Sequence, residues 1–416
     1  SVLCVLPESI LNGQNHDAFR KYNFLFSNVS VYFSLNEIWR IEENTFSNQA
    51  IIVKGNKKTK QSEVVTSDDI CQRKIYSEKA DTFSELHYNY LGNKSAWSES
   101  KLVKRKVAIK NANFRQGVDI MERALFFFDI SPIKAGIFEI NKISAESYMY
   151  FLKNDFKKYK NLSIDKCYVE GDLIYKAVLS KLLLPFFISD SIPVVLPIRI
   201  VKKEKYAPLS KESLILRNDD YKYMVSKFEQ AGVEFKELWE KLNTRNKLTN
   251  QNILINKSDG YIVYTGTSGT NVCAAYKKIQ EREIIDQTLN WYYTKSEDEA
   301  LFIVGLLNSE EINKIIKVFQ PRGQQGERHI HNLPYETSPK YDPNNAKHEY
   351  LVRITKRIIE DLTGKIETNE QFARNLDPNY SSLAVRRRRF KEMIQALPLY
   401  RDYEEICQNI YKEYLF

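Results

Sequence analysis

The chain opens on the apolar stretch SVLCVLPE, residues 1–8, and this pattern predicts a β-strand that ends at Pro7. A strand at this place has an apolar edge, and such an edge pairs with whatever strand is available. We therefore expect more of the same sheet to precede it, on a missing segment or on another chain.

Two further strands are expected at residues 29–33 and 49–55. A helical stretch ending in Phe19-Arg20 precedes them, and a turn at residues 43–48 separates them. Near-continuous apolar runs in this order are typical of the buried edge of an α/β sheet. The expected fold class is therefore α/β, with residues 1–60 forming the last strands of a larger sheet.

The remaining chain divides by composition into three parts. Residues 61–105 are polar and weakly periodic, as expected for a connector. Residues 106–345 mix strand-like and helical patterns, which predicts an α+β domain, and residues 346–416 predict a charged, helical C-terminal tail. Strands are expected at residues 107–109, 124–128, 136–140, 192–200 and 261–264, and helices at 146–159, 174–184, 221–241 and 297–307, the last capped by Ser296.

The charge of the chain favours an anionic partner. Its 416 residues carry a net charge of +9, and basic residues cluster at 54–60, 101–110, 202–203 and 386–389. Any one cluster is compatible with a solvated face, but together they favour a polyanion such as nucleic acid.

Composition also argues against several kinds of site. The five cysteines are scattered without CxxC spacing, which disfavours disulfides and structural zinc and favours a reducing cytoplasm. His329 and His331 form a lone pair without a further ligand, so no metal is expected. No apolar run approaches the roughly 18 residues of a membrane helix, so no membrane partner is expected.

The first sixty residues resemble the end of the catalytic domain of adenine-specific DNA methyltransferases. The resemblance rests on VLP at residues 5–7, on Phe19-Arg20, and on Phe46 before the apolar strand at 51–53. In that family the equivalent Phe packs on the flipped target base, which implies a base-stacking role for Phe46. A core Phe that fills the hairpin is an equally good explanation.

The later chain is similar to the target-recognition domains of restriction–modification enzymes. The shared order is an L-N-S signature at residues 307–309, Arg322-Gly323, a P-x-f-d segment at 339–342 and an H-x-x-L segment at 348–351. Residues 113–118 resemble the opening F-x-x-Gly turn of such domains, and residues 242–248 resemble their L-x-x-R helix end. The resemblance implies that residues 106–345 recognise duplex DNA.

Residues of the type that read DNA occur at these places. Arginine pairs with guanine and glutamine with adenine in the major groove, and hydroxyl and amide groups supply further donors and acceptors. The alternatives to DNA contacts are that residues 265–271 form a plain hairpin and that Arg322 is a surface residue held in a salt bridge. The candidate DNA-binding residues are Arg115, Gln116, Arg245, Thr267, Ser268, Asn271, Arg322, Gln324 and Arg328.

Two motifs of the methyltransferase family are missing from this chain. These enzymes bind S-adenosylmethionine at a Gly-rich turn and hold the flipped adenine with an Asn/Asp-Pro-Pro-Tyr loop, and neither occurs here. We therefore assign no catalytic, cofactor-binding or metal-binding residue, and we expect no methylation by this chain alone. The complete enzyme would use S-adenosylmethionine, supplied through a missing N-terminal catalytic segment. A stand-alone DNA-specificity subunit with a catalytic partner chain, and a protein-interaction scaffold, are the alternatives.

Overall fold

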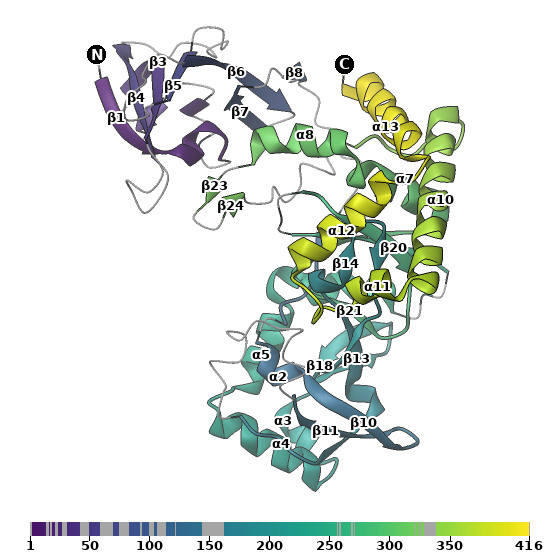
Figure 1. Ribbon diagram of the computed structural model, residues 1–416. Helices are drawn as coiled ribbons and strands as arrows, with labels where there is room; N and C mark the ends of the chain where they lie inside the picture. The colour runs from purple at the N-terminus through teal and green to yellow at the C-terminus, as the bar shows by residue number, and fades with distance from the viewer. Residues whose placement is uncertain are drawn as a thin grey trace.

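The computed structural model shows a mixed α/β protein with several small sheets and a helical C-terminal region (Figure 1). It describes residues 2–13, 16, 19–20, 24–26, 31–41, 50–58, 70–74, 83–91, 94–99, 104–105, 114–120, 122–143, 162–255, 257, 259–267, 269, 271–320, 322–323, 326–327 and 338–415. Within these ranges no helix has both the length and the apolar character that crossing a membrane requires.

The N-terminal region forms one sheet, in the strand order β1-β4-β3-β5-β6-β7. Most neighbours are antiparallel, but β3 and β5 are parallel, as are β6 and β8. The strands are β1 (Val2–Pro7), β2 (Phe24–Phe26), β3 (Val31–Arg40), β4 (Ala50–Lys58), β5 (Ile70–Lys74), β6 (Phe83–Leu91), β7 (Lys94–Ser98) and β8 (Lys104–Arg105).

The strands expected at residues 1–8 and 49–55 are confirmed as β1 and β4, and the one at 29–33 overlaps the start of β3. Residues 70–105, assigned to a connector from their polarity, contribute β5 to β8 to the same sheet. Only every second side chain of such a strand is buried, so a polar composition does not exclude it. The methyltransferase-like character of the sheet stays a prediction.

The Phe19-Arg20 pair has a structural role in this region. Phe19 packs edge-on against Trp97, with ring centroids 5.9 Å apart. The buried Arg20 guanidinium donates to the carbonyl oxygens of Ile10 and Gly13, each at 2.8 Å. The pair therefore fastens the segment after β1 to the sheet.

The central region combines small sheets with short helices around its own buried cluster. Its sheets have the orders β10-β11-β12, β16-β13-β21 and β20-β19-β22-β9, with hairpins β14–β15 and β17–β18. Its strands are β9 (Arg115–Gln116), β10 (Phe128–Lys134), β11 (Ile137–Lys142), β12 (Cys167–Glu170), β13 (Ile174–Val178), β14 (Leu183–Leu184), β15 (Phe187–Ile188), β16 (Ile192–Val195), β17 (Ile198–Val201), β18 (Lys205–Pro208), β19 (Tyr261–Gly266), β20 (Ala274–Lys278), β21 (Glu283–Ile285) and β22 (Leu289–Thr294). Its helices are α2 (Arg123–Phe126), α3 (Lys211–Ile215), α4 (Asp219–Gln230), α5 (Phe235–Leu242) and α6 (Lys247–Asn250), with 3-10 turns η7 (Thr244–Asn246) and η8 (Gln251–Leu254).

Three secondary-structure predictions for this region are wrong. The helix expected at 174–184 is β13 followed by a 3-10 turn and β14, because residues 174–178 pair on both sides with β16 and β21. The strand expected at 124–128 is α2 followed by the start of β10. The single helix expected at 221–241 is α4 and α5, separated at Gly232, whose φ of +74° ends the first helix.

Other expectations for this region are met or fall outside the described residues. The strands at 136–140 and 261–264 are β11 and β19, and 192–200 splits into β16 and β17. The elements expected at 107–109 and 146–159 lie outside the described residues.

The C-terminal helices pack on the central region through a second buried cluster. They are α7 (Glu297–Asn308), α8 (Glu310–Phe319), α10 (Ala346–Thr368), α11 (Glu370–Ala373), α12 (Leu383–Gln395) and α13 (Tyr400–Leu415). The predicted cap is confirmed, because the Ser296 side chain accepts from the Glu299 backbone. One buried cluster joins β19, β20, α7 and α8 to α10, α12 and α13, so the core continues across residue 345. Figure 1 shows α8 reaching the N-terminal sheet, where it contacts β7.

Candidate nucleic-acid interface

A buried ion pair between Arg123 and Asp286 supports the turn at residues 286–288. Asp286 is fully buried, and Arg123 donates to both of its carboxylate oxygens, at 2.8 and 3.1 Å. Arg123 also donates to the Ile120 carbonyl oxygen at 2.7 Å. The same carboxylate accepts from the backbone N–H and the hydroxyl of Thr288. These bonds determine the path of the turn.

The short strand β9 lies directly against this turn. Arg115 and Gln116 pair with Trp291 and Asn290 of β22, and the next residue is Gly117. A Cβ at Gly117 would lie 2.3 Å from the carbonyl oxygens of both Ile285 and Asp286. Only glycine permits this approach of two backbones, which explains the glycine of the F-x-x-Gly motif.

Gln287 connects β9 to α6 across the turn. Its carbonyl oxygen accepts from Gln116 Nε2 at 3.0 Å, and its own Nε2 donates to Asp119 at 3.0 Å. Its Oε1 accepts from Lys247 Nζ at 3.2 Å. Burial lowers the pKa of Lys247 and the nearby charge of Arg245 acts in the same direction, while Asp119 opposes them.

The segment between α5 and α6 has an unusual backbone. Arg245 and Asn246 have φ values of 55° and 59°, in the left-handed region that non-glycine residues avoid at a cost of roughly 1–2 kcal/mol each. Asn243 braces the segment, because its Oδ1 accepts from both the backbone N–H and the hydroxyl of Thr249. Both left-handed residues are exposed. Strained residues of this kind persist where the surrounding structure holds them, often at functional sites.

Arg115 completes the arrangement. Its guanidinium lies 5.8 Å from the centre of the Trp291 ring and donates to the Asn250 carbonyl oxygen of α6 at 3.3 Å. The structure thus brings the predicted residues Arg115, Gln116 and Arg245 to one surface, through α6 and the turn at 286–288. We call the surface made by Arg115, Gln116, Arg245, Asn246, Lys247 and Gln287 the polar face.

The loop at 265–271 adjoins this face at one end. The Thr267 backbone N–H and hydroxyl both donate to the Thr288 carbonyl oxygen, at 3.0 and 3.1 Å, so its hydroxyl is engaged within the protein. At the other end Asn271 is exposed, and a Cβ at Gly269 would lie 3.5 Å from Arg387 Nη1.

The remaining predicted residues are not brought to the polar face by the described structure. Arg322 lies in β23 (Arg322–Gly323), which pairs with β24 (Gly326–Glu327) and contacts η1 (Glu8–Leu11) of the N-terminal region. Phe46, Ser268, Gln324 and Arg328 lie outside the described residues.

Two arginines of the basic cluster at 386–389 bond to backbone groups of the central region, while Arg388 is exposed. Arg386 is 1% exposed and donates to the Lys181 carbonyl oxygen, while Arg387 donates to those of Ser180 and Leu183. These bonds fasten α12 to the central region. Arg386 and Arg387 therefore have partners within the protein, and the expectation that the four basic clusters together bind nucleic acid stays a prediction.

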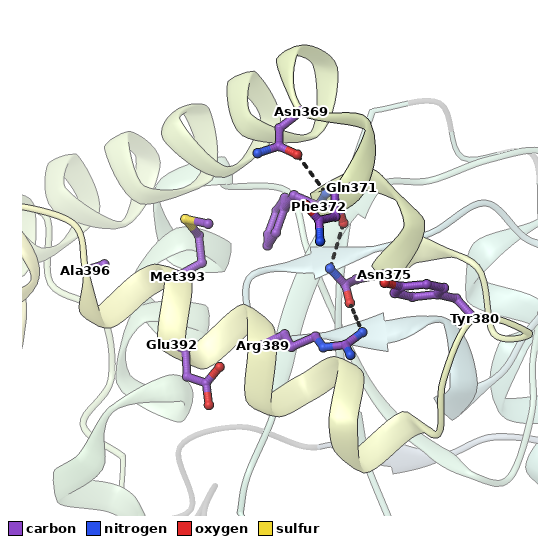
Figure 2. A pocket seen from close by; sticks show the side chains of 9 residues that line it. All are labelled: Asn369, Gln371, Phe372, Asn375, Tyr380, Arg389, Glu392, Met393 and Ala396. Atoms are coloured by element: carbon purple, nitrogen blue, oxygen red, sulfur yellow. Dashed lines mark hydrogen bonds between the residues drawn. The ribbon is translucent and has the colours of Figure 1, made fainter.

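Arg389 faces a pocket of about 410 Å³ (Figure 2). It donates to Asn375 Oδ1 at 3.0 Å, and its guanidinium lies 5.1 Å from the centre of the Tyr380 ring. Asn375 in turn donates to the Phe372 carbonyl oxygen at 2.8 Å. Arg389 and Asn375 thus bond within the protein, and we assign this pocket no ligand.

The L-N-S signature is structural. The Asn308 side chain accepts from the Ala274 backbone N–H at 3.0 Å and donates to the Ala274 carbonyl oxygen at 2.8 Å, as a neighbouring strand would. The Ser309 hydroxyl accepts from the Ile312 backbone at the start of α8. The motif therefore secures β20 and the joint between α7 and α8.

His348, from the H-x-x-L segment, makes the stability of the helical region depend on pH. Its ring lies 4.4 Å from that of Phe302, and its Nδ1 accepts from the Asp342 backbone N–H. Burial lowers the pKa of His348 below its usual 6.5. Because the folded protein favours the neutral ring, this stabilisation is complete above pH 6.5 and is lost as the pH falls through the lower folded pKa. We expect urea denaturation to show this loss of stability as the pH falls below 6.5, and His348→Gln to reduce it; an unchanged profile in the variant would contradict the assignment.

Sequence reasoning missed three members of the polar face. Asn246 and Lys247 directly follow Arg245, so the L-x-x-R segment already marked their position. Gln287 carries no local signal, because its partners Gln116 and Asp119 are distant in the chain.

Comparison with known proteins finds similarity only among solved structures, and it is distant. No family model and no curated protein matches the chain. Among solved structures, 99% of the chain aligns with 47% of the type IIG restriction endonuclease BpuSI, with 12% identity and a TM-score of 0.26. The chain thus spans about half the length of that protein, and a TM-score this low does not establish a shared fold.

Proposed function

We propose that this chain recognises double-stranded DNA through the polar face. The observation that carries the proposal is the convergence of Arg115, Arg245 and Lys247 on one surface beside the amides of Gln116 and Asn246. Cations anchor phosphates, and amide and guanidinium groups pair with base edges. The buried Arg123–Asp286 pair supplies the firm support that such contacts need.

The motif resemblances support a more specific assignment. We propose that the chain is the recognition part of an adenine-specific DNA methyltransferase of a restriction–modification system. The complete enzyme would transfer a methyl group from S-adenosylmethionine to an adenine amino group, with the catalytic motifs on a missing N-terminal segment. A separate DNA-specificity subunit that binds a catalytic chain is the alternative. The residues of this chain are proposed to recognise DNA and not to catalyse methyl transfer, because the motifs that hold the cofactor and the base do not occur among them.

Replacing Arg245 with alanine tests the polar face. We expect duplex binding to weaken by about 1–3 kcal/mol while the melting temperature changes little, because the side chain is exposed. A labelled duplex is titrated from low to physiological salt, where the parent chain should show a log–log slope of about −0.9 per phosphate contact. Arg353→Ala, an exposed arginine on α10, is the matched control.

The outcomes separate the candidate functions. A loss confined to one target sequence indicates base readout by Arg245, and an equal loss on all sequences indicates a phosphate contact. Unchanged affinity in the variant removes Arg245 from the interface. If the parent chain binds no duplex at low salt, a protein-interaction scaffold becomes the better interpretation.

A further inference from the structure

The β17–β18 hairpin, which we call the arm, carries four exposed cationic side chains. Arg199, Lys202, Lys203 and Lys205 are all exposed, and Glu204 is the one acidic residue among them. In the described part of the chain, no carboxylate forms an ion pair with any of these four cations. This contrasts with Arg386 and Arg387 of α12, which bond to backbone carbonyl groups.

The tip of the hairpin is conformationally demanding. Lys203 and Glu204 have φ values of 68° and 52°, a left-handed pair for which glycine or asparagine is usual. The turn therefore holds Lys202 and Lys203 at the tip at some cost in conformational energy.

Tyr206, near the start of β18, anchors the hairpin next to the polar face. The Tyr206 ring is buried against Tyr175, with centroids 6.2 Å apart. The Tyr206 backbone N–H donates to Asn252 Oδ1 at 2.9 Å, and β18 contacts α6. The same helix α6 accepts the hydrogen bond from Arg115 and begins with Lys247. The arm thus extends the charged surface beyond α6.

We propose that this hairpin contacts the phosphate backbone of the DNA duplex next to the segment bound by the polar face. The inference rests on the proposed function and deepens it. Lysine ammonium groups act as point charges that bind phosphates, whereas base readout favours the amides and guanidinium groups found on the polar face. Continuity with that face, through α6, makes DNA a better occupant than an acidic protein.

The test is the double variant Lys202→Gln/Lys203→Gln in the full chain. Each lost phosphate contact reduces the log–log salt slope by about 0.9, so we expect a slope shallower by about 1.8. The same relation implies a loss of affinity of roughly thirtyfold near 0.15 M salt. The loss should be equal on all duplex sequences. The matched control, Lys356→Gln/Lys365→Gln on α10, removes the same charge elsewhere and should leave the slope nearly unchanged.

A second variant separates binding from folding. Lys203→Gly removes a charge and relieves the left-handed backbone, so it should weaken binding while the melting temperature stays the same or rises. An unchanged salt slope in the double variant would contradict the phosphate contact of the hairpin but not DNA binding by the polar face. If the parent chain binds no duplex, both proposals are wrong. Two other results would also contradict a phosphate contact. In one, the double variant loses affinity for a single duplex sequence only. In the other, it loses affinity for polyglutamate, an acidic polypeptide, but binds duplex DNA as well as the parent chain does.

Discussion

Replacement of Asp286 by alanine is expected to lower the free energy of unfolding by about 3–5 kcal/mol, because it leaves the buried charge of Arg123 without its carboxylate. The substitution also removes the acceptor for the backbone N–H of Thr288. The measurement is urea denaturation followed by circular dichroism. We expect duplex affinity to fall as well, since the turn at 286–288 carries Gln287 of the polar face.

Two comparisons make this prediction specific. The double variant Arg123→Met/Asp286→Leu removes both charges and should recover part of the lost stability. Asp219→Ala removes an exposed carboxylate that pairs with Lys222 on a helix surface, and should leave stability nearly unchanged. An Asp286→Ala protein as stable as the parent chain would show that the pair does not support the turn.

The second large effect is expected from Gly117→Ala. The added Cβ would meet two carbonyl oxygens at 2.3 Å, so the backbone of β9 or of the turn must move. We expect a loss of about 1–3 kcal/mol in stability and weaker duplex binding, because Arg115 and Gln116 would move with β9.

Gly364→Ala is the matched control for this substitution. Gly364 lies within α10 with nothing within 4 Å of its added Cβ, so the same chemical change should stabilise the protein by up to about 1 kcal/mol. If Gly117→Ala were equally stabilising, the close approach of β9 to the turn would not exist in solution.

Much of the secondary structure could be predicted because its cause is local. β1, β4, β11 and β19 follow from apolar runs, and α7 follows from its apolar content and the Ser296 cap. The errors arise where long-range pairing outweighs local pattern. Residues 174–178 have helical spacing, but strand partners from 192–195 and 283–285 on both sides determine their conformation.

The residues of the candidate site also differ in whether the sequence could identify them. Arg115, Gln116 and Arg245 could be selected from the sequence, because two short motifs marked their positions. Gln287 could not, because it belongs to the site only through bonds to Gln116, Asp119 and Lys247. Such bonds depend on how separate segments meet, and no local pattern encodes this.

The sequence by itself determined the excess of positive charge, the apolar runs that become strands and helices, and the motifs that point to duplex DNA. Only the tertiary structure decided which charges face solvent. Arg386 and Arg387 belong to a longer basic run in the sequence, yet their guanidinium groups donate to carbonyl oxygens of the central region. Lys202 and Lys203, in contrast, lie on an exposed turn. A cation is available to a partner only where the fold leaves it solvated and unpaired, and that depends on packing between segments distant in the chain.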